Sequence, residues 1–221
     1  MHHPQLEQCP LFQGLTPEEQ AYALSYFDAK TKTYEKGEFL HHVSFPLERF
    51  GLVLSGTVQV YMDDMDGHHI IMNSVGAGGL FGEAYCFLGT DAPIYICAVT
   101  ESEILWMSPN RIKAPMPPFR PLDWALSNRF ISALATRTLH MNQRIQILSR
   151  NTLRMKLTTF LSQYAAAQGD SFTVPFDRQA LADYLCVDRS ALSHELSKMQ
   201  RDGLLTFRKN RFTLTGPMED P

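Results

Sequence analysis

The feature that most constrains this chain is the stretch between Pro121 and Pro175, which contains no proline and a single glycine, Gly169. Proline breaks the interior of a helix and glycine weakens it, so this stretch predicts long helices. It follows a proline-rich loop (residues 115–121) and separates two parts of the chain that differ in their pattern of residue types. We therefore expect an N-terminal domain over 1–120, a long helix over 121–150 and a C-terminal domain over 151–221.

The part before the proline-rich loop reads mainly as short strands. Thr16-Pro17 predicts one helix that runs to about Phe27. From about residue 29 to 107, short β-branched and aromatic runs alternate with turn residues, and Asp66-Gly67 between two such runs predicts a hairpin. Many short strands at regular spacing favour a β-barrel or jelly roll, and the whole chain then belongs to the α+β class.

The long helix carries a heptad pattern. Its positions alternate in spacings of four and three, which is typical of a seam between two helices. The members of this pattern are Ser127, Ile131, Leu134, Thr138, Met141, Ile145, Leu148 and Thr152. We expect a homodimer whose interface includes Ile131, Leu134, Thr138, Met141, Ile145 and Leu148. The alternative is a helix that packs on its own domain.

Residues 176–214 predict a winged helix-turn-helix. Asp177 suits the cap of a helix over 178–185, a turn follows at 186–188 with Asp188 as the next cap, and a second helix spans 189–201. One face of this second helix is apolar, while the other is small and polar, as in a helix that enters the major groove of DNA. A basic hairpin around Lys209-Asn210 follows it and suits phosphate contacts. The candidate DNA-binding residues are Arg189, Ser190, Ser193, His194, Ser197, Arg208, Lys209 and Arg211.

Charge is distributed unevenly along the chain. Residues 1–149 hold 10 basic and 15 acidic residues, a formal charge of −5, whereas residues 150–221 hold 10 basic and 8 acidic residues, a charge of +2. This asymmetry suits a sensor joined to a nucleic-acid reader. The four cysteines are scattered and no apolar run is long enough for a membrane span, so we expect a cytoplasmic protein without a metal centre or membrane contact.

Signatures of common enzymes are missing from the sequence. It holds no Gly-rich phosphate loop, no H-E-x-x-H and no G-x-S-x-G. The glycine cluster at 76–79 lies between expected strands, where a barrel turn is the simpler interpretation. We therefore expect no catalytic residues.

Several segments together resemble the bacterial catabolite-activator/fumarate-nitrate-regulator (CRP/FNR) family of transcription regulators. RQALADYLCVDRSALSHELSKMQRDGLL is similar to the helix-turn-helix of that family, CPLFQGLTPEE to its first helix, and LVLSGTVQV with GGLFGEAYCFLG to its sensor barrel. The resemblance covers roughly Cys9 to Leu214. It implies a cyclic-nucleotide-binding-like barrel, a dimer on a near-palindromic site in double-stranded DNA, RNA polymerase as a partner, and an effector sensed by the barrel.

The resemblance also shows where this chain departs from the family. Arg189 matches the first base-reading position, but Ser190 and His194 replace a common glutamate and a common arginine, and Cys186 replaces a turn glycine. We therefore expect DNA binding with a different operator sequence.

The barrel departs from cyclic-nucleotide binders of the family. Gly82-Glu83 is present, but the arginine that grips the cyclic phosphate about ten residues later is replaced by Pro93. In such proteins, two positions of the long helix face the base of the cyclic nucleotide, and in this chain they are Met141 and Asn142. A buried phosphate without a cationic partner is unfavourable, so cyclic AMP is not expected as the effector.

The sequence alone does not identify the effector or any cofactor. One possibility is an uncharged, partly aromatic small molecule in a pocket formed by Gly82, Glu83, Phe81, Tyr85, Phe87, Tyr95, Met141 and Asn142. The aromatic residues are equally suited to filling the barrel. A haem-based gas sensor would need ligands from His41-His42, His68-His69, Cys86 or His140, and a ligand-binding module that acts through a protein partner is a further alternative.

Overall fold

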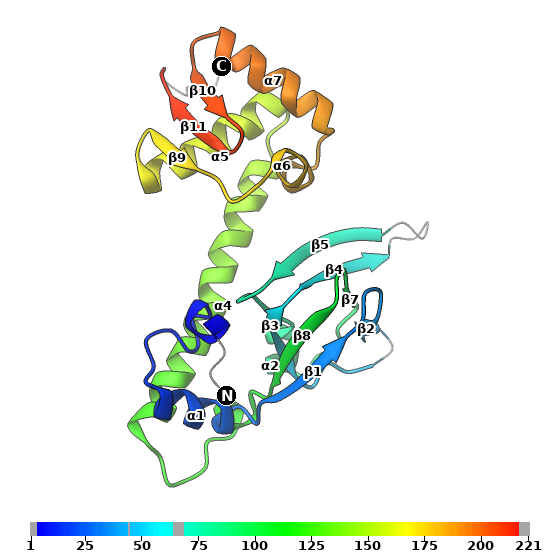
Figure 1. The fold of residues 1–221 in the computed structure, drawn as a ribbon, viewed down its shortest axis with the longest axis vertical. Helices are drawn as coiled ribbons and strands as arrows, with labels where there is room; N and C mark the ends of the chain where they lie inside the picture. Colours follow the sequence, from blue (N-terminus) through cyan, green and yellow to red (C-terminus); the bar gives the residue numbers. More distant parts are fainter. Residues whose placement is uncertain (1–3, 44, 64–68, 217–221) are drawn as a thin grey trace. The chain divides into compact units, whose positions relative to one another are not determined.

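The structure is a computed structural model, and it describes residues 4–43, 45–63 and 69–216, with only the backbone of 69–71. The chain divides into two compact units between Thr136 and Arg137. This division lies within the long helix α4 (Pro121–Leu148), which is helical throughout, as the proline-free stretch predicted. Figure 1 follows the course of the chain.

The first unit contains two four-stranded antiparallel sheets. In spatial order, one sheet consists of β1 (Lys30–Tyr34), β8 (Ser102–Met107), β3 (Phe50–Ser55) and β6 (Leu80–Phe81), and the other of β2 (Phe39–His41), β7 (Tyr95–Ala98), β4 (Thr57–Asp63) and β5 (His69–Gly76). Alternating residues such as Val58, Val60, Ile96 and Ile104 point into a shared core. The predicted jelly-roll sandwich is therefore confirmed.

β4 and β5 are antiparallel neighbours, with Asp63 opposite His69 (Figure 1). The Asp66-Gly67 turn that the sequence predicted between them lies outside the described residues.

In the described part of this unit, four short helices accompany the sheets. They are the 3-10 helix η1 (Pro4–Gln8) and the helices α1 (Pro17–Tyr26), α2 (Glu83–Leu88) and α3 (Asn110–Lys113). Thr16 caps α1 as predicted, and Glu19 completes a capping box by accepting from the Thr16 backbone nitrogen at 2.9 Å. The sequence reading assigned neither α2 nor α3, because helices of six and four residues are too short to show a helical period.

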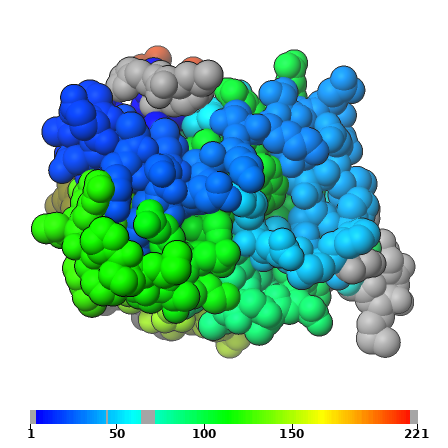
Figure 2. All heavy atoms as spheres, turned by 90° about the horizontal axis from the view of Figure 1, so that it is seen from below, coloured from blue at the N-terminus to red at the C-terminus, as the bar shows by residue number. Residues whose placement is uncertain are grey.

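A second core in this unit joins the N-terminal helices to the first half of α4. Tyr22 donates to Asp123 at 2.6 Å, and Tyr26 shares a hydrogen bond with Ser127 at 3.1 Å. Phe130 of α4 is fully buried in the same cluster. Figure 2 shows the N-terminal segment, in dark blue, lying directly against the green segment that contains the start of α4. The first half of α4 is thus part of the first unit.

The second unit is a small α/β assembly. It contains α5 (Leu153–Gln168), α6 (Arg178–Leu185), α7 (Arg189–Arg201) and a three-stranded sheet of order β10 (Leu205–Arg208), β11 (Arg211–Leu214) and β9 (Ser171–Thr173). Phe160 of α5, Leu196 of α7 and Phe212 of β11 meet in its core, which also takes in Ile147 from the end of α4. The predicted winged helix-turn-helix is confirmed as a fold. Among the described residues, no helix has the length and apolar character needed to cross a membrane.

Candidate functional site

The turn between α6 and α7 is built as the sequence indicated, with one correction. The Asp177 carboxylate accepts from the Ala180 backbone nitrogen at 2.8 Å and caps α6. Cys186 ends α6 in the left-handed region, with φ 53° and ψ 55°, which explains why a glycine would suit this position. Asp188 stands at the cap position of α7, but its side chain makes no capping bond, so the prediction of a side-chain cap there was wrong.

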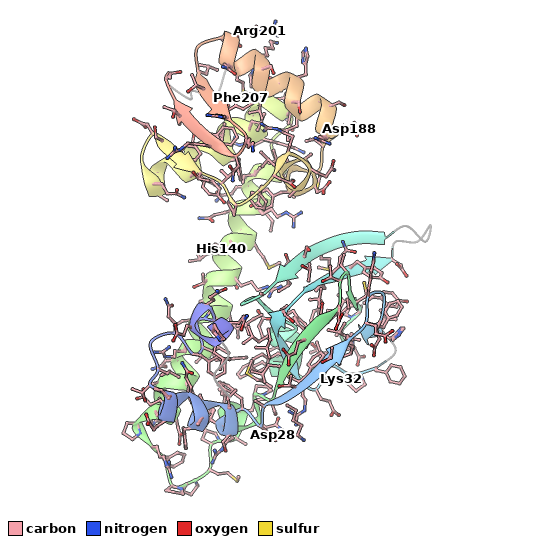
Figure 3. The ribbon with its side chains drawn as sticks, in the orientation of Figure 1. Asp28, Lys32, His140, Asp188, Arg201 and Phe207 are labelled. Carbon is pink, nitrogen blue, oxygen red and sulfur yellow. The ribbon has the colours of Figure 1, made fainter. Side chains whose placement is uncertain are left out.

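α7 presents one buried face and one exposed polar face. Leu192, Leu196 and Met199 are fully buried against the rest of the unit. Arg189, Ser190, His194 and Ser197 are exposed and Ser193 is half-buried, which places all five candidate base-reading residues on the opposite side. Figure 3 marks the two ends of this helix with Asp188 and Arg201.

The two serines on this face donate hydrogen bonds within the helix. Ser193 Oγ donates to the Arg189 carbonyl oxygen, and Ser197 Oγ donates to the Ser193 carbonyl oxygen, each at 2.9 Å. Their protons are thus engaged, and the oxygen lone pairs remain to accept from an outside donor. In a major groove such donors are the amino groups of adenine and cytosine.

Side chains from α5 hold α6 and α7 in place. Arg154 donates from Nε to Glu195 and from Nη2 to Asp202, both at 2.6 Å. These two bonds raise the pKa of the Arg154 guanidinium. Lys156 Nζ donates to the carbonyl oxygen of Leu185 at 3.2 Å, at the negative end of α6. The sequence reading did not assign these roles, because the partners are about 30 to 50 residues apart along the chain.

The basic hairpin is anchored at its tip. Arg208 pairs with Arg211 across a two-residue turn in which Lys209 has φ 56°. Asn210 donates through Nδ2 to the Val174 carbonyl oxygen at 3.0 Å, and the Val174 nitrogen donates back to Asn210 at the same distance. Arg208, Lys209 and Arg211 are all exposed.

Arg178 belongs to the same basic surface, and sequence reasoning missed it. Its guanidinium lies 5.0 Å from the centroid of the Phe207 ring and donates to the Lys209 carbonyl oxygen at 3.3 Å. Burial, and then the charge of Arg189, lower the pKa of this guanidinium. Arg178 thus joins the start of α6 to the hairpin. Its sequence signal was only its position directly after the Asp177 cap.

The predicted effector residues of the first unit lie around the start of α2. Gly82 has φ 77°, and Glu83 follows it as a buried residue. Phe81 is fully buried in the core between the sheets and meets Trp106 edge-on at 5.4 Å. Tyr85 packs on that core, whereas Phe87 packs in the other core, 5.5 Å from Phe130.

Tyr95 lies elsewhere. It stacks on Tyr61 with ring centroids 5.2 Å apart and contacts Phe39, away from the core that holds Phe81. The aromatic residues proposed for one pocket are thus divided among three surroundings. This division follows from the elements that carry them, since Phe81 lies on β6, Tyr85 and Phe87 lie on the helix α2, and Tyr95 lies on β7 of the other sheet.

The arginines that flank the effector motif in sequence are engaged in other contacts. Arg49 donates to the backbone oxygen of Asp28 at 2.7 Å and forms an ion pair with the Asp28 carboxylate. Arg111 lies over the ring of Tyr26 at 5.3 Å. Pro93 is exposed.

The seam positions of α4 have different surroundings. Leu134 packs on the core that contains Phe130. Leu148 is half-buried, and Thr138 is exposed. Ile131, Met141 and Ile145 expose 53%, 54% and 61% of their surface, large fractions for apolar side chains. Asn142 is exposed as well.

The residues considered as haem ligands are not gathered into one site. Buried His41 shares a hydrogen bond with the Ala92 carbonyl oxygen at 3.3 Å, and burial lowers its pKa. Exposed His42 lies on Phe39, and His140 is exposed on α4. The Cys86 thiol donates to the Glu48 carbonyl oxygen at 3.0 Å, and burial raises its pKa to about 11. His68 lies outside the described residues, and of His69 only the backbone is described.

No metal-binding arrangement is found in the described part of the chain, where no three His, Cys, Asp or Glu side chains are grouped suitably for an ion.

Two known families match separate parts of the chain. Residues 31–114 match the cyclic nucleotide-binding domain, and residues 155–218 match the Crp-like helix-turn-helix domain. The cyclic AMP receptor protein of Thermus thermophilus is 32% identical over 96 residues. That match spans 43% of this chain and 44% of the relative, less than half the length of either protein.

Solved structures share the fold over most of the chain. A CooA mutant from Carboxydothermus hydrogenoformans is similar with a TM-score of 0.61 at 20% identity, covering 88% of this chain and 86% of that one. FixK2 from Bradyrhizobium japonicum is similar with a TM-score of 0.56 at 20% identity, covering 85% and 93%. With its cyclic nucleotide-binding domain followed by a Crp-like helix-turn-helix domain, the chain belongs to the CRP/FNR family.

Proposed function

We propose that this protein is a sequence-specific DNA-binding transcription regulator that works in the cytoplasm and is not an enzyme. The observation that carries the proposal is α7, which buries Leu192, Leu196 and Met199 and exposes a polar face beside a basic hairpin. A helix of this kind, fixed from behind, suits insertion into a major groove. RNA polymerase would be the protein partner of such a regulator.

The exposed residues divide into two roles. Arg189, Ser190, Ser193, His194 and Ser197 would contact base edges, and Arg189 at the start of α7 suits a bidentate contact with guanine. Arg208, Lys209 and Arg211 would contact phosphates, which carry no sequence information but supply much of the affinity. Arg178 would hold the hairpin in position through the Lys209 carbonyl oxygen.

We also propose a homodimer formed through the helix over 121–150, with a sensor domain over 1–120 and a DNA-binding domain over 151–221. The two family matches lie within these outer segments. Exposed Ile131, Met141 and Ile145, together with Leu134, Thr138 and Leu148, follow the heptad spacing. Two subunits would place two copies of α7 on a near-palindromic operator.

The effector is proposed to be a small molecule other than cyclic AMP. Pro93 stands where the phosphate-gripping arginine is expected, and Arg49 and Arg111 are engaged with Asp28 and Tyr26. The arginine expected to pair with a cyclic phosphate beside buried Glu83 is therefore missing from its place in the sequence.

Selection of bound sequences from a random DNA pool tests the main proposal. The full-length protein should enrich a near-palindromic motif with half-sites about one helical turn apart. The Arg189→Ala variant should lose this enrichment but keep weak, salt-sensitive binding. Equal retention of all sequences by the unmodified protein would contradict the proposal.

A further inference from the structure

A shallow cavity of about 420 Å³, largely open to solvent, lies on the first unit between β1, β2, β8 and residues 45–49. Its volume lies within the range of roughly 300–1,000 Å³ that small-molecule sites in proteins have. Its walls are rich in aromatic rings, contributed by Tyr34, Phe39, Phe45 and Trp106. The cavity thus offers flat apolar surfaces for an aromatic ligand.

The rim of the cavity exposes apolar surface to solvent. Phe45 exposes 65% of its surface and Phe39 exposes 40%, and Val43 between them is also exposed. Large apolar side chains that stay exposed together commonly mark a contact surface for another molecule. A ligand ring placed against Phe45 and Phe39 would remove this surface from water.

Polar groups in the same cavity can orient a ligand. The Trp106 Nε1 donates to the Tyr34 hydroxyl at 2.9 Å, so the Tyr34 proton can be donated to a ligand acceptor. His41 is buried beside them, and burial lowers its pKa, which favours the neutral imidazole. A ring that carries a hydrogen-bonding substituent suits this combination of groups.

The charged residues of the lining disfavour an anionic ligand. Arg49 already pairs with the Asp28 carboxylate, so its charge is compensated. Glu48 is exposed at the cavity, and its carboxylate would repel a negative group. The ligand is therefore expected to be uncharged.

The cavity is adjacent to the effector motif, although Gly82 and Glu83 do not line it. Leu47, a lining residue, lies very close to Gly82. A Cβ atom added to Gly82 would be 2.6 Å from the Cδ2 atom of Leu47. Trp106, another lining residue, meets Phe81 edge-on at 5.4 Å. A molecule in the cavity would thus contact side chains that pack directly on Phe81 and Gly82.

We propose that this cavity is a binding site for an uncharged aromatic molecule of one or two rings that carries a hydrogen-bonding group. The site lies beside the Gly82-Glu83 motif and is distinct from the pocket that the sequence suggested. Its role as the effector site rests on the proposed function as a regulator. Ligand binding itself does not depend on that proposed function, because it can be measured on the free protein without DNA.

The test uses indole as the probe and the two tryptophans as reporters. Trp106 lines the cavity, whereas Trp124 lies exposed on α4 and serves as the internal reference. Titration of the ¹⁵N-labelled full-length protein should shift the Trp106 indole signal in a saturable manner and leave the Trp124 signal unchanged. Benzoate, the anionic comparison, should bind at least several-fold more weakly than indole.

Two matched variants locate the binding. Phe45→Ser should weaken indole binding roughly 2- to 12-fold, the equivalent of one lost aromatic contact. Phe119→Ser removes a similarly exposed ring outside the cavity, at 57% against 65% exposure, and should leave the affinity unchanged. The proposal is overturned if Trp106 does not respond to indole, if benzoate binds as tightly, or if both variants behave alike. None of these outcomes bears on DNA binding, which the selection experiment tests separately.

Discussion

The guanidinium of Arg154 donates to the carboxylate of Glu195 at 2.6 Å and thereby ties α5 to α7, the proposed recognition helix. A second bond from the same guanidinium reaches Asp202, directly after the end of α7. Both Arg154 and Glu195 expose less than a third of their side chains, so solvent screens this contact less than an ordinary surface pair. Arg154 thus holds α7 from outside the face that we propose to contact DNA.

A double-mutant cycle with Arg154→Met and Glu195→Gln should give a coupling energy of about 1 kcal/mol in the free energy of unfolding, decreasing as salt is added. The reason is the near-ideal geometry of a partly shielded, charge-assisted bond. Lys30 and Asp28 provide the control, because their pair at 3.8 Å is well exposed and should couple far more weakly. Equal coupling in the two cycles would argue against a special role for Arg154.

Cys186→Gly should raise the free energy of unfolding by about 0.5–1 kcal/mol. Cys186 adopts φ 53°, where a side chain is strained and glycine is not. Cys186→Ala keeps the Cβ atom and should leave the stability nearly unchanged. Urea unfolding of the two variants compares them directly, and a glycine variant no more stable than the alanine variant would show that the left-handed turn costs little.

Arg189→Ala should weaken binding to the selected operator by about 1–3 kcal/mol while changing binding to unrelated DNA much less. Lys209→Ala should weaken binding to the operator and to unrelated DNA equally. It should also flatten the dependence of affinity on salt, because it removes a phosphate contact. Fluorescence anisotropy at several salt concentrations separates the two effects. An unchanged operator affinity in Arg189→Ala would remove this residue from the base-reading set.

Ile131→Lys combined with Ile145→Lys should convert the protein to monomers and abolish operator binding. Both side chains are more than half exposed in the single chain, so the charges should not disturb its core. Leu134 is a less suitable target, since it packs on the core of its own unit. Leu139→Lys, at a similarly exposed position off the heptad, is the control and should leave the dimer intact in analytical ultracentrifugation. A dimer that persists after the double substitution would refute the proposed heptad interface.

Cyclic AMP should give no heat of binding at micromolar concentrations in calorimetry. The physical reason is the missing phosphate partner, since Pro93 replaces the expected arginine and Arg49 is paired with Asp28. The cavity beside Leu47 gives a matched comparison, because indole should still bind there to the same sample. Micromolar cyclic AMP affinity at one site per chain would overturn this expectation.

Much of the architecture could be predicted because its signals are local. The Thr16 and Asp177 caps, the span of α7 and the turn at Lys209-Asn210 depend on residues within a few positions of one another. The site was only partly predictable, because some of its contacts join residues that are far apart in the sequence. Arg178 and Arg154 act through residues about 30 to 50 positions away, and no local pattern announces such contacts.

The sequence by itself determined the succession of strand-rich part, long helix and winged helix-turn-helix, the family, and the polar and apolar faces of α7, because periodicity and capping are properties of neighbouring residues. Only the tertiary structure decided which aromatic side chains share a space. Phe81, Phe87 and Tyr95 lie within 15 residues of one another, yet they enter three different surroundings. Conversely, Trp106 is more than 60 residues away from Tyr34 and Phe45 along the chain, yet the three line one cavity. The pairing of strands and the packing of the short helix α2 beside β3 set these neighbours, and both depend on how the first unit folds as a whole.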